Sequence, residues 1–205
     1  MSDVDEAELL RRARHGDDAA FAQLFSRYQR AIFRYAAHMC GDAAADDVVQ
    51  ETFLVVLRRG GKFDTARGTF SAFLFGIARN VILKQLGDRY QLPGDIEDAV
   101  EEASPHADAL ESITEQERIE AVRAAIASLP PLYREVVALC DLEDVDYESA
   151  AAVLSCPIGT IRSRLHRARA MLTSKLAGLR DSAGDGTGGG EDGGRVNRRA
   201  LSRSR

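Results

Sequence analysis

Apolar side chains recur at spacings of three and four residues along most of this chain, and this repeat limits its fold more than any other feature. The longest stripe lies in residues 21–39 and consists of Phe21, Leu24, Phe25, Tyr28, Ile32, Tyr35 and Met39. Stripes of the same period lie in residues 49–57, 70–81 and 119–140. Since no segment alternates apolar and polar residues as a half-buried strand would, the sequence predicts an all-α protein.

Glycines and capping residues divide the first stripes into separate helices. Gly41 is expected to end one helix and Asp42 to cap the next, because glycine favours helix C-termini and aspartate favours N-caps. Gly60 and Gly61 are expected to end that second helix, and a third should end near Gly87.

The helical period is lost twice, and this divides the chain into four parts. Residues 5–87 and 112–179 carry the apolar stripes and are predicted to form two small helical domains. Residues 88–111 hold prolines, a glycine and many acids, which favours a flexible acidic linker. Residues 180–205 are rich in glycine and arginine and are predicted to be a disordered tail.

The net charge of −5 hides a strong segregation of acids and bases along the chain. Between Gly87 and Glu117 there are ten acids and one base, whereas Ile158 to Arg180 contains six bases and no acid. Contact with nucleic acid depends on local charge, so the acidic total does not exclude a DNA-binding protein.

Metal sites, membrane insertion and catalysis find no support in the sequence. Cys40, Cys140 and Cys156 have no metal-ligand spacing and are expected to be small buried apolar residues. The first ten residues lack the basic start and apolar core of a signal peptide, and no apolar run approaches the roughly 20 residues of a membrane span. No phosphate-binding loop or nucleophile motif occurs, so we expect a cytoplasmic protein without cofactor that is not an enzyme.

Residues 147–172 have the pattern of a helix-turn-helix. Small or apolar residues that would let two helices cross closely are Ala150, Ala151, Leu154, Ile158, Ile161 and Leu165. The polar residues expected to face outward from the second helix are Arg162, Ser163, His166, Arg167 and Arg169. Arginine can grip a guanine edge or neutralise a phosphate, which favours duplex recognition. A basic, solvated helix on a bundle is the alternative.

Four segments resemble conserved parts of the extracytoplasmic-function (ECF) sigma factors, group 4 of the sigma-70 family. DDVVQETFLVVL (residues 46–57) resembles the polymerase-binding helix of region 2, and KFDTARGTFSAFLFGIARNVIL (residues 62–83) resembles its −10 recognition segment. ASLPPLYREVVALCDLEDV (residues 127–145) and DYESAAAVLSCPIGTIRSRLHRARAML (residues 146–172) resemble the region 4 helix-turn-helix. The motifs stand in the family's order.

The resemblance implies a function in transcription initiation. Region 2 of such a protein binds core RNA polymerase and captures melted −10 DNA, while region 4 reads the −35 duplex of the promoter. The family is commonly controlled by an anti-sigma factor, often in a stress response. A helix-turn-helix regulator that acts without binding polymerase is the alternative function.

In the segment that resembles the polymerase-binding helix of region 2, the polar residues are expected to contact the polymerase: Asp46, Asp47, Gln50 and Glu51. An exposed acidic and polar patch suits a basic partner surface. The alternative is that the acids complement the positive end of the helix dipole, which would explain Asp46 and Asp47 but not Gln50 and Glu51.

The residues expected to hold −10 DNA are Lys62, Phe63, Asp64, Arg67, Arg79 and Asn80. An unstacked base needs an aromatic wall and polar groups for its edge, and this composition permits both. A plain connecting loop in which Phe63 fills the core is the alternative. Phe73 stands where many family members have tryptophan, and its place in the apolar stripe favours core packing.

Overall fold

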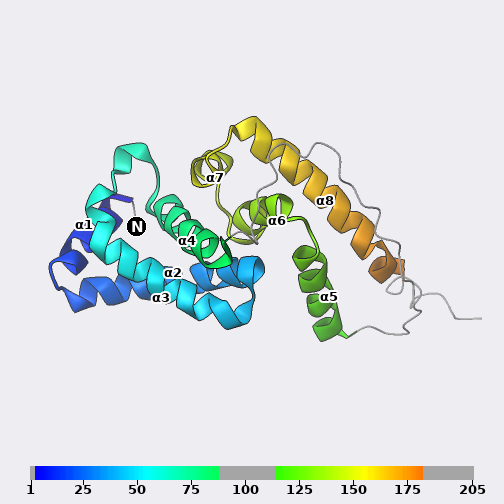
Figure 1. Cartoon of the computed structure of the whole chain (residues 1–205), viewed down its shortest axis with the longest axis horizontal. Helices are drawn as coiled ribbons and strands as arrows, with labels where there is room; N and C mark the ends of the chain where they lie inside the picture. Colours follow the sequence, from blue (N-terminus) through cyan, green and yellow to red (C-terminus); the bar gives the residue numbers. More distant parts are fainter. Residues whose placement is uncertain (1–2, 88–113, 182–205) are drawn as a thin grey trace, which may run out of the picture.

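The computed structural model of the chain describes residues 3–87 and 114–181, and these residues are helical with no strand among them (Figure 1). The N-terminal domain, residues 3–87, contains α1 (Asp3–Arg14), α2 (Asp18–Cys40), α3 (Asp42–Arg59), two 3₁₀ turns η1 (Gly60–Lys62) and η2 (Thr65–Arg67), and α4 (Phe70–Leu86). The C-terminal domain, residues 114–181, contains α5 (Glu115–Ala127), α6 (Pro131–Val137), a π turn η4 (Ala138–Leu142), α7 (Tyr147–Leu154) and α8 (Ile158–Asp181). The all-α prediction is confirmed.

The predicted acidic linker, residues 88–111, lies outside the described residues, as does the predicted tail from residue 182 onward. Arg180 and Asp181, which the sequence analysis assigned to the tail, belong to α8. The reason is that leucine, alanine, lysine and arginine favour helix, and no proline interrupts them.

Aromatic rings fill the core of the N-terminal domain. Phe70 is fully buried at the start of α4, and its ring contacts those of Tyr28, Phe63 and Phe73 at centroid distances of 5.4, 5.3 and 6.3 Å. Deeper in the domain, Tyr35 of α2 meets Phe75 of α4 edge to face at 5.4 Å. Each such ring contributes roughly 1.5–3 kcal/mol through burial, so these contacts fix α4 against α2.

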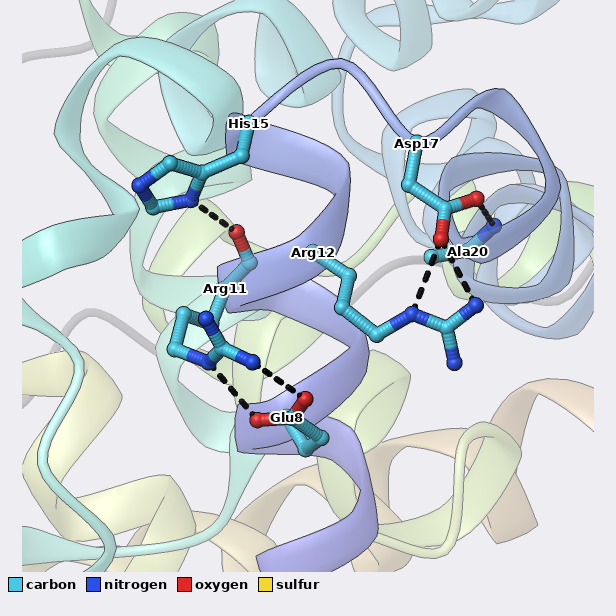
Figure 2. A network of polar contacts seen from close by, with 6 residues as sticks. All are labelled: Glu8, Arg11, Arg12, His15, Asp17 and Ala20. Carbon is cyan, nitrogen blue, oxygen red and sulfur yellow. Dashed lines mark hydrogen bonds and ion pairs between the residues drawn. The ribbon is translucent and has the colours of Figure 1, made fainter.

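One ion pair spans the turn between α1 and α2, and another lies within α1 (Figure 2). Asp17 is the N-cap of α2: its carboxylate accepts a hydrogen bond of 3.0 Å from the Ala20 N–H and pairs with Arg12 at 2.6 Å. Arg11 is engaged in a pair with Glu8. These bases of α1 therefore serve the local fold. The apolar residues of α1 are sparse, and the sequence analysis did not predict this helix.

Gly41 serves both helices that it joins, and Asp42 does not cap α3 as expected. Gly41 closes α2 through its N–H on the Ala37 carbonyl and is also the N-cap residue of α3, with Asp42 already inside the helix. The backbone of Gly41 has φ of 86°, which favours glycine. The chain turns within one residue, so no position remains for a side-chain cap.

The helix-turn-helix of the C-terminal domain forms as predicted. Asp146 caps α7 by accepting a 2.8 Å hydrogen bond from the Ser149 N–H, and Ser155, with φ of 53°, makes the left-handed turn before α8. Most of the predicted crossing residues are buried, and one of them, Ile158, is half-buried: Ala150, Ala151, Leu154, Ile158, Ile161 and Leu165.

The two domains pack directly against each other. In Figure 1, α7 and α6 lie beside α4, at the centre of the molecule. Helix α2 also contacts α5 and α6, and one continuous apolar core includes residues of both domains. The sequence analysis predicted two domains but no contact between them.

We predict that replacing Asp146 by alanine will destabilise the chain by about 1 kcal/mol at neutral pH, because the Ser149 N–H loses its acceptor. Asp146→Asn should retain most of the stability, since asparagine caps equally well. The backbone N–H of Ser149 lowers the pKa of the Asp146 carboxyl below its ordinary value. The contribution of the charged cap is thus present above the unfolded-state pKa and is lost as pH falls through the lower, folded-state pKa.

Urea unfolding from neutral pH to about one unit below the ordinary aspartate pKa of about 3.9 tests this prediction. The stability difference between wild type and Asp146→Asn should change across the acidic end of that window. The difference between the asparagine and alanine variants should stay constant. A wild-type curve that runs parallel to the asparagine curve at all pH values would contradict the charged cap.

Candidate nucleic-acid and partner interfaces

The exposed face of α8 carries the five residues that the sequence analysis assigned to −35 DNA. All of them are exposed: Arg162, Ser163, His166, Arg167 and Arg169. Ile161, Leu165 and Ala168 are buried on the opposite side against the rest of the domain. The buried side fixes the rotation of the helix, so the polar face points to solvent and forms a contiguous basic surface.

Arg169 of this face is held by an acid from another part of the same domain. Its guanidinium makes a two-point ion pair with the Asp141 carboxylate in the π turn, with an Nε–Oδ2 distance of 3.1 Å. The Asp141 carboxylate raises the pKa of Arg169 above its ordinary value. This pair ties α8 to the π turn and so positions the recognition face, a role that sequence reasoning missed because 28 residues separate the partners.

The four predicted polymerase contacts lie on α3. Asp46, Asp47 and Gln50 are exposed, and Glu51 is half-buried. Helix α3 begins at Asp42, so Asp46 and Asp47 lie beyond its first turn, where the helix dipole acts most strongly. The dipole alternative therefore explains these acids poorly.

A groove between α2 and α3 adjoins these residues. Its volume is about 360 Å³, and it is lined by Phe25, Gln29, Arg30, Phe33, Arg34, Asp46, Val49 and Gln50. The apolar floor was missed by sequence reasoning, because the periodic stripe assigned Phe25 to the core and left Phe33 unassigned. Leu54, further along α3, is 44% exposed. An apolar groove with a polar rim suits a protein partner better than it suits DNA.

The loop before α4 contains an aromatic side chain that packs against the core and an exposed arginine, Arg67. Phe63 is half-buried against Phe70 and Phe73, with 5.3 and 5.4 Å between ring centroids. It therefore packs against the core, which agrees with the alternative that the loop only connects two helices. Asp64 caps η2 by accepting from the Ala66 N–H at 3.0 Å. Arg67 is exposed, and the side chain of Lys62 is not among those described.

Arg79 and Asn80, the last two predicted −10 residues, occupy different environments. Asn80 is exposed on α4. Arg79 is largely covered, with 12% of its side chain exposed, and its Nε lies 2.7 Å from Oε1 of Glu135 on α6. The Tyr35 hydroxyl donates to the same oxygen at 3.2 Å. This arrangement brings together the two domains, and no periodic pattern could have indicated it.

A second ion pair joins the domains at their rim. Arg34 of α2 pairs with Glu143 through two hydrogen bonds of 2.8 and 2.6 Å. Burial raises the pKa of the Glu143 carboxyl, because the loss of hydration outweighs the attraction of Arg34. The Arg34 side chain remains 54% exposed, and the same residue lines the groove between α2 and α3.

The cysteines are half-buried and unpaired within the described residues, whereas the sequence analysis expected full burial. Burial raises the pKa of the Cys140 thiol to about 11, so it stays protonated at neutral pH. Among residues 3–87 and 114–181, no cluster of histidine, cysteine and carboxylate side chains could hold a metal ion. In the same part of the chain, none of the helices has the length and apolar character of a membrane span.

Comparison with known proteins assigns both domains. The family model of Sigma-70 region 2 matches residues 24–92, and that of Sigma-70 region 4 matches residues 119–172. Among solved structures, CnrH in complex with the cytosolic domain of CnrY superposes with a TM-score of 0.62, at 27% identity over 84% of this chain and 97% of that one. The sigma factor RpoE of Bartonella quintana, solved with the anti-sigma factor NepR, gives a TM-score of 0.59 at 28% identity, over 77% and 96% of the two chains.

Relatives named as sigma factors match most of the chain. The ECF RNA polymerase sigma factor SigE of Mycolicibacterium smegmatis is 36% identical over 79% of this chain, which spans 65% of that relative. The RNA polymerase sigma-H factor of Pseudomonas aeruginosa is 34% identical over 87% of this chain and 97% of its own length. The ECF RNA polymerase sigma-E factor of Escherichia coli K12 is 32% identical over 83% and 94%. The chain therefore belongs to the sigma-70 family, among the ECF RNA polymerase sigma factors.

Proposed function

We propose that this chain directs core RNA polymerase to specific promoters and helps to melt them, acting as a cytoplasmic protein without a catalytic site of its own. One observation carries the proposal: the chain combines a polar and apolar partner surface on α3 with an exposed basic face on α8, each within its matched family region. Polymerase supplies the chemistry, and the sigma factor supplies position.

The two surfaces support different steps of initiation. The α3 surface and its groove would dock onto a basic and apolar surface of the polymerase. The basic face of α8 would enter the major groove of the −35 duplex. Arg67 and Asn80 are exposed near the start and along the face of α4, where they can contact the phosphates or base edges of melted −10 DNA.

We also propose that an anti-sigma factor controls this chain. The proposal draws on the likeness to RpoE of Bartonella quintana, which was solved with an anti-sigma factor. A regulator that binds duplex DNA without polymerase would need no partner groove on α3. Transcription in vitro from a library of random promoters, with and without core polymerase, tests the function and separates the two alternatives.

We predict that reversing the charge of Asp47 and Glu51 to lysine will weaken association with core polymerase by at least about tenfold, because like charges then face the basic partner surface. Fluorescence titration of labelled protein with core enzyme measures the effect. Asp144→Lys with Glu148→Lys reverses two exposed acids of the other domain and is the matched control. Unchanged core affinity together with an unchanged circular dichroism spectrum would exclude α3 as the docking helix.

We predict that at least one of Arg162 and Arg167 reads a base edge of the −35 element. Its replacement by alanine should cost about 1–3 kcal/mol and relax specificity at one base pair. An arginine that only neutralises phosphate should weaken all sequences alike and reduce the salt dependence by roughly one unit. Lys175→Ala, further along α8, is the control. The readout is transcription by variant holoenzymes from promoters changed one base at a time; wild-type base preference in both arginine variants would exclude this face as the reader.

A further inference from the structure

Glu135 is a carboxylate buried at the boundary between the two domains. It lies on α6 with 1% of its surface exposed, and its Oε1 accepts hydrogen bonds from Arg79 of α4 at 2.7 Å and from Tyr35 of α2 at 3.2 Å. Arg79 and Tyr35 belong to the N-terminal domain, whereas Glu135 belongs to the C-terminal one. The charge is therefore compensated across the domain boundary.

We call the arrangement in which the two domains pack against each other the closed state. The buried ion pair favours this particular packing but adds little to its stability. The second oxygen of Glu135, Oε2, is buried without a hydrogen-bond partner among the described residues. A buried ion pair gains little net stability, because desolvation offsets most of the attraction, but removing one partner strongly destabilises the state that buries the other. Separation of the domains would return Glu135 and Arg79 to water, so the closed state can open.

The closed state cannot serve a promoter. The −10 and −35 elements lie roughly 25 base pairs apart, which is about 85 Å along B-DNA at about 3.4 Å per base pair. In the closed state α7 packs against α4, and a tight turn joins α7 to α8. The start of the recognition helix thus lies within about two helix diameters, roughly 20–25 Å, of the −10 helix. Binding of both elements requires the domains to separate.

We propose that Glu135 is an intramolecular competitor of promoter DNA: its carboxylate occupies Arg79, which would otherwise bind a phosphate of the melted −10 strand, and so keeps the free sigma factor closed. The inference rests on the proposed function of Arg79 in −10 binding. Opening exchanges one anion on Arg79 for another, since a carboxylate and a phosphate both accept from the same guanidinium. The free protein then has little affinity for DNA until a partner separates its domains.

Arg34 connects this closure to the partner surface. It holds Glu143 of the C-terminal domain and also lines the groove between α2 and α3, beside Asp46 and Gln50. A basic polymerase segment that fills this groove would repel the Arg34 guanidinium and so weaken its pair with Glu143 at the rim of the closed state. Docking on α3 and opening of the domains are therefore coupled, which means that each favours the other.

The first measurement is the distance between the domains in the free, full-length chain. Spin labels at Ala22→Cys on α2 and Ser174→Cys on α8, in a background where the three native cysteines are serine, report it by electron–electron double resonance. Glu135→Gln preserves the shape of the side chain but removes the negative charge that faces Arg79 across the domain boundary, so the distance distribution should shift to longer values. Glu148→Gln, an exposed carboxylate of α7, is the matched control and should leave the distribution unchanged.

The second measurement is affinity for a fluorescent single-stranded DNA oligonucleotide of mixed sequence, without polymerase. Glu135→Gln should bind at least about tenfold more tightly than wild type, because the competent state is more populated. Adding Arg79→Ala should abolish that gain. Glu143→Gln removes the other carboxylate that pairs across the domain boundary, and it should change both readouts in the same direction but by less, because the Arg34 side chain of that pair is 54% exposed.

Two outcomes would overturn the proposal. Unchanged distances in both Glu135→Gln and Glu143→Gln would show that these carboxylates do not hold the domains together. Open domains without a gain in DNA affinity would show that Glu135 does not mask Arg79. Transcription by the holoenzyme distinguishes a failure of this inference from a failure of the proposed function. Glu135→Gln should keep promoter activity once core enzyme is bound. A wild-type chain that is inactive with core enzyme would refute the sigma function but would leave the distance result valid.

Discussion

The structure depends on α4 being buried on more than one side. Phe70, Leu74, Phe75, Ala78 and Ile82 are all buried, and the helix packs against α2 and α3 within its own domain and against α7 of the other. A helix that is apolar over most of its surface must be covered by several neighbours. Helix α4 therefore organises the N-terminal core and also provides the surface on which the C-terminal domain closes.

The packing of the two domains leaves some of the proposed binding surfaces open and covers another. The groove between α2 and α3 and the basic face of α8 both remain open to solvent when the domains are closed. Arg79, in contrast, lies on the side of α4 that the closure covers. On the functions proposed for these surfaces, a partner can reach α3 first, whereas Arg79 becomes available to −10 DNA only after the domains separate.

The helix-turn-helix and the polar face of α3 could be predicted from the sequence because each lies on one helix or on two adjacent ones. The spacing of Ile161 and Leu165 fixed the buried side of α8, and Arg162 and Arg167 had to lie on the other. The pairs Arg169–Asp141 and Arg79–Glu135 could not be predicted in this way. Their partners are 28 and 56 residues apart, and the helical period carries no information about which faces of distant helices meet.

The sequence by itself determined the helices other than α1 and most of the residues that face a core, because a 3.6-residue period relates sequence position to angular position. Tertiary structure alone decided that the domains close on each other, that Glu135 faces Arg79, and that Phe33, which packs against the core, also lines a groove. The physical reason is that burial and charge compensation between distant helices depend on how whole faces pack, and that packing is fixed only when all of the helices are in place.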